Sequence, residues 1–504
     1  MKLIKTIGVV GAGAMGRGIA QLFVQSGFTV FCYDMSKDAT NDAIEYVKKM
    51  VRKSVEKGRL EESALDALND NLLAASSLQD LSECDMVIEA IVENVSVKQD
   101  LFNELESIIS DDSILASNTS SLVIAEIASQ CQHPERVAGL HFFNPVPLMK
   151  VAEIIAAVRT HSSVVHSLKD LIEATGHRAV VTEDQPGFLV NHAGRGLYTE
   201  GLRIVEEQVA SPHVVDTILR EAANFRMGPF ELMDLTGLDV SGKVMESIYQ
   251  QFLHEPRFRP SSLVPPRISA GLFGRKTSQG WYSYKEGKRI DSQDATTGYP
   301  SVSGSVWIDP KATDTEALTQ FVAEQSWTLA SESDDADLIL IQPWGQDASG
   351  YCAENHLEAQ KVVAIDPLPG LDKHRTLMLT CVTSESARNM ACTLFSADGV
   401  PFSVINDSPG FICQRVIATI VNIAANIAQR GIASVDDLED AVKIGLGYPS
   451  GPLHLGDSVG AANIFEILTQ QQKTTGDDRY RPSLWLRRRA QLGLALTSEE
   501  ARRS

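Results

Sequence analysis

Residues 6–16 read Thr-Ile-Gly-Val-Val-Gly-Ala-Gly-Ala-Met-Gly, an apolar run that leads into a loop with the spacing Gly11-x-Gly13-x-x-Gly16. In such a loop the first glycine permits a tight turn, the second lets the backbone approach a pyrophosphate, and the third lets the next helix pack on the strand. That helix opens with Ala14 and Met15, so its N-terminal N–H groups would face the phosphates. The loop predicts a dinucleotide site, although a glycine-rich turn that binds nothing has the same spacing.

The second apolar run, residues 28–34, ends at Asp34, eighteen residues after Gly16. A carboxylate at this place accepts both hydroxyls of an adenine ribose and repels a 2′-phosphate. We therefore expect NAD, rather than NADP, as the cofactor.

Strand-like runs at 85–90, 113–119 and 136–143 follow, each separated from the next by a helical stretch. Strands that alternate with helices predict an α/β fold of the Rossmann type with a mostly parallel, doubly wound sheet. From Asn191 the pattern changes to long amphipathic stretches, which predict an all-helical domain over about 187–290. The Gly-, Ser-, Thr- and Pro-rich tract Thr296–Gly304 is typical of a linker.

The helical region occurs twice. One offset of 223 residues, without a gap, relates Asp184 and Pro186-Gly187-Phe188 to Asp407 and Pro409-Gly410-Phe411, Gly228-Pro229 to Gly451-Pro452, and Asp234 to Asp457. Between the copies, residues 336–341, 361–365 and 377–382 look like strands of a degenerate second α/β segment that lacks the glycine loop. We expect four segments: 1–186, 187–295, 305–404 and 405–504. Only the first half is expected to carry a functional site, because Asp366 and Gln414 stand where that half has His141 and Asn191.

Composition restricts the setting of the protein. The 504 residues are 43% hydrophobic, as in a globular protein of about three domains. No apolar run is long enough for a membrane helix, and the apolar stretch after Met1 has no signal-peptide cleavage pattern. Seven scattered cysteines without a Cys-x-x-Cys spacing favour reduced thiols and disfavour a disulfide scaffold or a metal site. We expect a cytoplasmic protein that binds no metal.

The formal net charge of −20 disfavours nucleic acid and anionic membranes as partners. An anionic ligand would therefore need local positive charge. A predicted helix supplies it at spacings of three and four residues, with Lys48, Lys49, Arg52, Lys53 and Lys57. This cluster is either a solvated basic face or a ligand-binding face.

His141 lies in the run Leu140-His141-Phe142-Phe143-Asn144-Pro145, and Glu153 follows twelve residues later. Histidine is the side chain whose ordinary pKa lies nearest neutral pH, which suits a general base. A nearby carboxylate fixes the tautomer of such a base and stabilises its protonated form. The pair alone could belong to a buried core histidine. Its position in the same segment as the dinucleotide loop predicts a dehydrogenase.

Polar side chains also follow two other predicted strands. Glu93 comes after one strand, with Lys98 one turn into the next helix, and Ser117-Asn118-Thr119-Ser120-Ser121 closes the following strand. The carboxyl ends of parallel strands line the ligand crevice, so these residues are candidate cofactor or substrate contacts. The hydroxyls could instead cap a helix. Asn191, one turn after Pro186-Gly187-Phe188, could bind a substrate oxygen or tie its helix to the sheet.

Taken together, the chain resembles the 3-hydroxyacyl-CoA dehydrogenase family. The resemblance rests on the glycine loop and on six further motifs, Glu89-Ala90-x-x-Glu93-Asn94, Ser117-Asn118-Thr119-Ser120-Ser121, His141-Phe142-Phe143-Asn144-Pro145, Pro186-Gly187-Phe188-x-x-Asn191, Gly228-Pro229-Phe230-Glu231-Leu232-x-Asp234 and Gly274-Arg275-Lys276-Thr277-Ser278-x-Gly280-Trp281-Tyr282. It covers residues 1–290 densely and 405–500 as the second helical copy. The duplicated helical domain is most similar to the branch of the family that oxidises 3-hydroxyadipyl-CoA in bacterial phenylacetate degradation.

The resemblance implies a role for each matching position. His141 would remove the 3-hydroxyl proton as hydride leaves for NAD, and Glu153 would orient His141. Ser120 and Asn191 would hold the reacting oxygen, and Asn144 would support the nicotinamide and the histidine. The implied cofactor contacts are Gly11, Gly13, Ala14, Met15, Gly16, Asp34, Glu93, Lys98, Asn118, Ser120 and Asn144. The implied CoA contacts are Lys49, Arg52 and Lys53 on the basic helix, together with Ser120 and Asn191.

Several alternatives stay open. A short-chain 3-hydroxybutyryl-CoA dehydrogenase would have nearly the same sequence features, and an enzyme on this scaffold could oxidise a sugar acid without CoA. A catalytically silent NAD-binding structural protein is the alternative of another class. Family members dimerise through their helical domains, so we expect a homodimer, although the two copies could also pair within one chain. One position departs from the family: His192 replaces the usual arginine, which the second copy keeps as Arg415.

Overall fold

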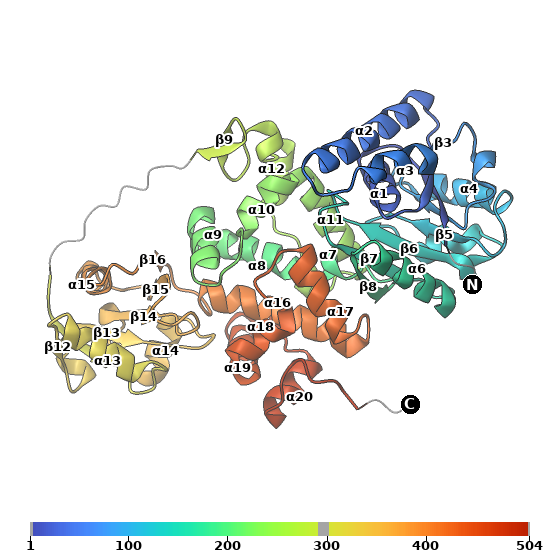
Figure 1. Ribbon diagram of the computed structural model, residues 1–504. Helices are drawn as coiled ribbons and strands as arrows, with labels where there is room; N and C mark the ends of the chain where they lie inside the picture. The colour runs from blue at the N-terminus through green and yellow to red at the C-terminus, as the bar shows by residue number, and fades with distance from the viewer. Residues whose placement is uncertain (1–3, 291–301, 502–504) are drawn as a thin grey trace. The chain divides into compact units, whose positions relative to one another are not determined.

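The computed structural model describes residues 4–290 and 302–501, which form two compact units (Figure 1). The first unit contains Met1–His192 and Arg430–Leu446, and the second contains Ala193–Gln429 and Gly447–Ser504. The predicted linker, residues 296–304, lies outside the described residues except for Val302–Gly304, which have no regular structure. A short piece of the second half of the chain therefore belongs to the first unit.

The first unit is built on an eight-stranded sheet. Its strands are β1 (Thr6–Val10), β2 (Thr29–Tyr33), β3 (Leu72–Ala74), β4 (Met86–Glu89), β5 (Ile114–Ser117), β6 (Val137–Phe142), β7 (Val151–Ala156) and β8 (Arg178–Glu183). They lie in the order β3-β2-β1-β4-β5-β6-β7-β8, and every neighbouring pair is parallel except β6 and β7. This arrangement confirms the predicted doubly wound α/β fold.

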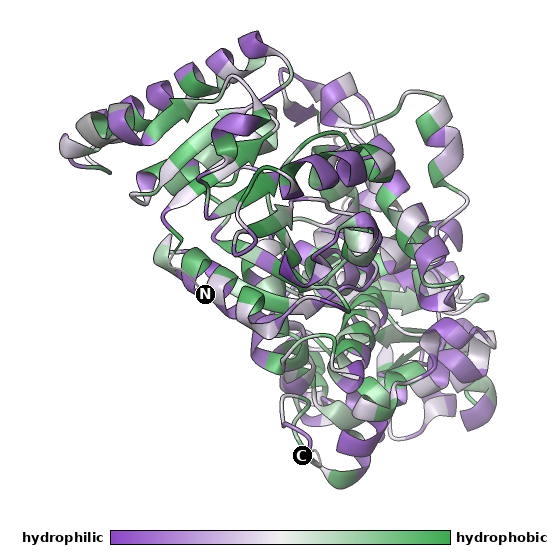
Figure 2. Ribbon diagram, turned by 90° about the vertical axis from the view of Figure 1, so that its right-hand side faces the viewer, coloured by the Kyte–Doolittle hydropathy of each residue, from purple (hydrophilic) through white to green (hydrophobic). Residues whose placement is uncertain are grey.

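Helices cover both faces of this sheet. One apolar core contains side chains from α1 (Ala14–Gln25), α2 (Lys37–Glu56), α3 (Ser63–Asn71) and α6 (Ser162–Ala174). The core on the other face contains side chains from α4 (Val95–Glu106) and α5 (Ile124–Ile127). Figure 2 shows hydrophobic colour along the central strands and alternating hydrophilic and hydrophobic colour along the helices. Each helix thus buries one apolar face on the sheet, as its periodicity predicts.

The second unit contains both helical copies. The first copy comprises α8 (Arg195–Glu206), α9 (Pro212–Glu221), α10 (Pro229–Thr236), α11 (Leu238–Gln251) and α12 (Val264–Ser269). The second copy comprises α16 (Ile412–Arg430), α18 (Pro452–Val459), α19 (Ala461–Thr475) and α20 (Leu484–Leu492). The first copy ends in a hairpin of β9 (Ser283–Lys285) and β10 (Lys288–Ile290), which an all-helical expectation did not include.

A second sheet of six strands lies between the copies in sequence, in the order β12-β11-β13-β14-β15-β16. Its strands are β11 (Ser305–Ile308), β12 (Thr328–Leu329), β13 (Leu338–Ile341), β14 (Val362–Ile365), β15 (Arg375–Leu379) and β16 (Phe402–Ile405), with helices α13 (Thr315–Glu324), α14 (Ala348–Asn355) and α15 (Glu385–Ser396). The predicted strands correspond to β13, β14 and β15, whereas β11, β12 and β16 were not predicted. One pair of neighbouring strands in this sheet, β14 and β15, is antiparallel, and the other pairs are parallel. The first sheet likewise has one antiparallel pair, β6 with β7.

One pair of corresponding aspartates makes the same contacts in both halves. Asp184 accepts the N–H groups of Ile124 and Ala125 at 3.1 and 2.8 Å. Asp407, 223 residues later, accepts those of Ala348 and Ser349 at 2.8 and 3.1 Å. In both halves an aspartate from the Pro-Gly-Phe turn thus holds the start of a helix. The internal repeat seen in the sequence is also a repeat of structure.

The two helical copies meet through α8 and α16. A Cβ on Gly196 would lie 3.2 Å from the backbone N of Ile420, so the helices approach very closely there. The buried Arg415 on α16 donates to Glu200 on α8 at 2.7 Å and to Glu207 at 2.8 Å. Because all these residues belong to the second unit, the contact is made within one chain.

Among the described residues no helix is long and apolar enough to cross a membrane. The same part of the chain contains no group of three or more His, Cys, Asp or Glu side chains arranged to hold a metal ion.

Candidate active site

The glycine loop joins β1 to α1 in a shape that requires glycine at Gly11 and Gly16. Gly11 has φ +105°, and a Cβ there would lie 2.5 Å from the carbonyl oxygen of Ala90. A Cβ on Gly16 would lie 1.7 Å from the oxygen of Gly11, so the helix can pack this closely only with glycine. Gly13 differs, because a Cβ there would meet no atom within 4 Å. The missing side chain at Gly13 leaves open space at the N-terminus of α1, where no side chain caps the helix.

This geometry fits the dinucleotide that the loop predicts. Open space beside uncapped N–H groups at a helix N-terminus is the arrangement that accepts a pyrophosphate. Asp34, half-buried at the end of β2, accepts the N–H groups of Ala12 and Ser36 at 2.8 and 2.9 Å. Its carboxylate is thereby held against the glycine loop, next to Gly13 in sequence through its bond to Ala12.

A buried ion-pair cluster lies at the end of β4, the strand that pairs with β1. Lys98 on α4 is 1% exposed, and its Nζ lies 2.5 Å from Glu89 Oε1 and 3.3 Å from Glu93 Oε2. The fully buried Glu89 also accepts from Ser117 Oγ at 2.7 Å. Lys98 thus links the predicted Glu93 to a second carboxylate, that of Glu89. Sequence reasoning did not single out Glu89 itself, although an acidic residue that ends an otherwise apolar strand was a usable signal.

Glu93 anchors the loop that follows β5. It accepts hydrogen bonds from Thr119 Oγ1 at 2.6 Å, Ser121 Oγ at 2.9 Å and the Ser120 N–H at 3.1 Å. Partial burial alone would raise the pKa of Glu93, but the bonds from Thr119 and the loop and the charge of Lys98 lower it overall. The hydroxyl of Ser120 makes no hydrogen bond within the described residues, whereas Asn118 Oδ1 accepts from the Phe142 N–H at 2.9 Å. The loop is therefore fixed while the Ser120 hydroxyl stays available.

His141 and Glu153 face each other across the antiparallel pair β6 and β7, in direct register. Nδ1 of His141 lies 2.6 Å from Oε2 of Glu153, and the carboxyl group is fully buried. A carboxylate only accepts, so Nδ1 carries the proton and the lone pair is on Nε2. The histidine is 6% exposed and packs edge-on against Phe143, with ring centroids 4.5 Å apart. The predicted pair is thus assembled with one ring nitrogen oriented by the acid.

The second oxygen of Glu153 is held by the start of α7 (Val190–Ala193). Oε1 accepts the N–H groups of Leu189 and Val190 at 2.9 and 2.7 Å. A sequence motif could not predict these partners, because a motif identifies side chains and these donors are backbone groups. The next residue is the predicted Asn191, which is half-buried, and His192 after it is buried. Glu153 therefore connects β7 to the helix that carries Asn191.

The remaining predicted residues lie on the surface of the first unit. Asn144 is exposed directly after β6. Lys49, Arg52 and Lys53 are exposed on the outer face of α2 and form no ion pair with another described residue, whereas Lys48 pairs with Glu45 at 3.1 Å. Three unpaired cations on one helix face keep their charge for an external anion.

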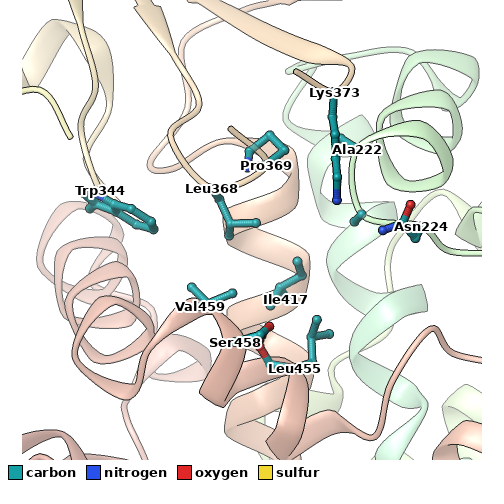
Figure 3. A pocket seen from close by; sticks show the side chains of 11 residues that line it. Ala222, Asn224, Trp344, Leu368, Pro369, Lys373, Ile417, Leu455, Ser458 and Val459 are labelled. Carbon is teal, nitrogen blue, oxygen red and sulfur yellow. Dashed lines mark hydrogen bonds between the residues drawn. The ribbon is translucent and has the colours of Figure 1, made fainter. Parts of the chain in front are cut away.

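In the described part of the second half, the positions that match the proposed site carry other side chains. At the place of the glycine loop, Asp309 directly follows β11 and accepts from Tyr351, and Asp314 stands before α13. Carboxylates here repel phosphate. Asp366, at the position of His141, is buried and binds Gln414 at 3.1 Å. A cavity of about 250 Å³ lies in the second unit, and Leu368 and Lys373 are among the residues that line it (Figure 3).

Family comparisons agree with this geometry. The model of the 3-hydroxyacyl-CoA dehydrogenase NAD-binding domain matches residues 6–185, and the model of the family's C-terminal domain matches 187–284 and again 410–501. The chain belongs to the 3-hydroxyacyl-CoA dehydrogenase family, and it is an NAD-dependent oxidoreductase acting on 3-hydroxyacyl-CoA. The second match to the C-terminal domain confirms the internal repeat.

Individual relatives cover the chain to different extents. The 3-hydroxyadipyl-CoA dehydrogenase of Escherichia coli (strain K12) is 35% identical over 489 residues, which cover 97% of this chain and 98% of that protein. A crystal structure described as 3-hydroxybutyryl-CoA dehydrogenase from Escherichia coli K12 substr. MG1655 has a TM-score of 0.84, with 34% identity over 97% of this chain and 98% of that one. A probable 3-hydroxybutyryl-CoA dehydrogenase of Bacillus subtilis (strain 168) is 38% identical over 56% of this chain and 98% of its own length.

Proposed function

We propose that His141 is the general base that removes the 3-hydroxyl proton of the substrate through Nε2. The supporting observation is the 2.6 Å contact between Nδ1 and Glu153, which leaves the lone pair on the other nitrogen. When Nε2 takes the proton, the buried carboxylate stabilises the imidazolium that forms. In the reverse direction the same imidazolium returns the proton to the oxygen of the 3-oxoacyl group.

Bound NAD supplies the hydride acceptor for carbon 3. The glycine loop, with Gly11, Gly13 and Gly16, and the first residues of α1 would hold its pyrophosphate, and Asp34 its adenosine ribose. Glu93, whose carboxylate is fixed by the loop after β5, would face the nicotinamide side of the crevice. Lys98 acts there through its ion pair with Glu93. Asn118 and Asn144 would complete that side.

Ser120 and Asn191 would hold the reacting oxygen so that its proton points to His141. Ser120 supports this role because its hydroxyl makes no hydrogen bond within the described residues and its backbone is fixed by Glu93. Asn191 supports it because α7 is tied to Glu153 through Val190. Lys49, Arg52 and Lys53 would bind the phosphates of CoA.

We propose 3-hydroxyadipyl-CoA as the preferred substrate, because the relative of that name matches the chain over nearly its full length. The second candidate is 3-hydroxybutyryl-CoA, which is named for a structure of equal coverage. NADH formation across a panel of 3-hydroxyacyl-CoAs, with and without a terminal carboxylate, separates the two. A kcat/KM that is at least tenfold higher for the butyryl than for the adipyl thioester would overturn the first choice.

The base is tested by His141→Gln, which keeps the size and polarity of the side chain. We expect a loss of turnover of about 10³-fold with NAD binding intact, because the positioned base is removed. Near-wild-type turnover at neutral pH would show that another group takes the proton.

We also propose the four-segment organisation 1–186, 187–295, 305–404 and 405–504. A homodimer through the helical domains stays a prediction, and the contacts between α8 and α16 support pairing of the two copies within one chain. Light scattering on the purified protein distinguishes a monomer from a dimer.

A further inference from the structure

The first unit includes residues 430–446, although they come from the second half of the chain. This segment contains the end of α16, α17 (Val435–Asp440) and a π-helical turn, Ala441–Gly445. It packs against β7, the strand next to the one that carries His141, and against β8 on the far side of β7. The segment therefore contacts the strand that carries Glu153 and the strand beyond it, and it contains no proposed catalytic residue.

Three kinds of contact hold the segment there. The Glu183 N–H at the end of β8 donates to the Ile432 oxygen at 2.9 Å. Arg178 at the start of β8 donates from Nε to Asp440 and from Nη2 to Asp437, each at 2.7 Å. These two ion pairs share one guanidinium, which fixes the direction of α17 on the strand.

The third contact reaches the helix that supports Glu153. A Cβ on Gly445 would lie 3.2 Å from Cγ2 of Val190 and 3.4 Å from Cγ1 of Val151. Val190 donates its N–H to Glu153, and Val151 begins the strand that carries Glu153. At Gly445 the π-helical turn thus packs its backbone against Val190 and Val151, the two residues that help to position Glu153.

The internal repeat shows which of these contacts are general. The Asn406 N–H donates to the Val209 oxygen at 3.0 Å, and both residues lie at the offset of 223 from Glu183 and Ile432. Each repeat therefore supports the sheet of the other repeat through its backbone. The ion pairs are not repeated, because Pro401, Val214 and Thr217 stand at the positions of Arg178, Asp437 and Asp440. Among the described residues, these two ion pairs are therefore found on the sheet with His141 and have no counterpart on the second sheet.

We propose that residues 430–446 form a positioning segment that holds β7 and α7 in place, so that the second half of the chain is needed for full turnover. Arg178, Asp437, Asp440 and Gly445 are its positioning residues. The proposal rests on the function proposed for His141 and Glu153 and assigns a role to the second half that lacks a site of its own.

The test uses the full chain and two independent changes. Asp437→Asn with Asp440→Asn removes both ion pairs, and Asp436→Asn is the matched control on the same helix, where the carboxylate is exposed. Displacement of catalytic groups by a fraction of an ångström to 1 Å lowers turnover about tenfold to a hundredfold, so we expect kcat to fall in this range with KM for NAD unchanged. Asp436→Asn should keep wild-type kcat.

Gly445→Val tests the same role without a change of charge. The methyl groups of the new valine would push Val190 away. This would lengthen the hydrogen bond that the Val190 N–H donates to Glu153. A carboxylate with one donor fewer holds a protonated imidazole more tightly, so the acidic limb of the kcat/KM profile should move to higher pH. A loss of stability alone would lower the melting temperature and leave that limb in place. Gly445→Ala gives a smaller change of the same sign.

The outcomes separate the two proposals. If the double variant and Gly445→Val both keep kcat within about twofold and an unshifted pH profile, the positioning role is wrong. If His141→Gln keeps its turnover, the base assignment is wrong. If the double variant does not fold, Gly445→Ala decides by its pH profile, because it removes no ion pair.

Discussion

Exchange of Glu153 for glutamine tests the proposed catalytic pair with a minimal change of shape. One oxygen of Glu153 accepts the Leu189 and Val190 N–H groups, and the other accepts Nδ1–H of His141. The glutamine oxygen replaces only one of these acceptors. If it keeps the two backbone bonds, the amide NH₂ faces Nδ1, and the histidine must then move its proton to Nε2. Nε2 of His141, which should accept the substrate proton, would then already carry a proton.

The magnitude follows from the tautomer and the lost charge. In a Ser–His–Asp triad the corresponding acid-to-amide change lowers kcat about 10⁴-fold while the geometry persists. We expect a loss of about 10³- to 10⁴-fold for Glu153→Gln, which corresponds to roughly 4–5 kcal/mol in the barrier. Because both backbone bonds are kept, the free energy of unfolding should change by only about 1 kcal/mol.

The assay is NADH formation from a 3-hydroxyacyl-CoA under saturating NAD, with the melting temperature measured on the same samples. Glu173→Gln is the matched control, because Glu173 is exposed on α6. It should keep wild-type turnover. A turnover for Glu153→Gln within about threefold of wild type would refute the argument from the hydrogen bonds of this carboxylate.

Three further predictions concern the framework. Gly16→Ala should abolish NAD binding, measured by calorimetry, because its Cβ would lie 1.7 Å from the Gly11 oxygen; retained affinity would contradict the loop geometry. Arg415→Met should destabilise the chain by about 3 kcal/mol in urea unfolding, because it leaves the buried Glu200 without its cation; an unchanged midpoint would contradict this. Burial raises the pKa of Asp366 from 3.8 to about 7, so its stabilising protonated form is lost as the pH rises through about 7. Asp366→Asn should therefore gain stability relative to wild type between about pH 4 and 7, by roughly 4 kcal/mol; a difference that does not vary with pH would contradict this.

The sequence alone predicted β1, β2, β4, β5 and β6 of the first sheet, because the glycine loop and the alternating apolar runs have few other solutions, but it did not predict β3, β7 and β8. It also placed His141 near Glu153, but a spacing of twelve residues does not reveal an antiparallel reversal between β6 and β7. The direct register of the two residues depends on that reversal. The strands β11, β12 and β16 were missed because they are exposed or only partly buried, so that they lack the continuous apolar runs of β13 and β14.

The support of Glu153 lay beyond sequence reasoning for a different reason. Its partners at Leu189 and Val190 are backbone groups, which every residue has. The grouping of residues 430–446 with the first unit joins positions more than 250 apart in the chain, as in the contact of Arg178 with Asp437. No local pattern encodes such a pairing. The duplicated motifs indicated two copies, and only the coordinates show that a segment of one copy supports the sheet of the other.

The contact of residues 430–446 with β8 is intramolecular, and this has a consequence for enzymology. A support supplied by a separate subunit is lost on dilution, since its occupancy follows mass action. Here the covalent chain keeps the local concentration of the segment constant. The specific activity should consequently stay the same from micromolar to picomolar enzyme, where a family member that depends on a second polypeptide would lose activity.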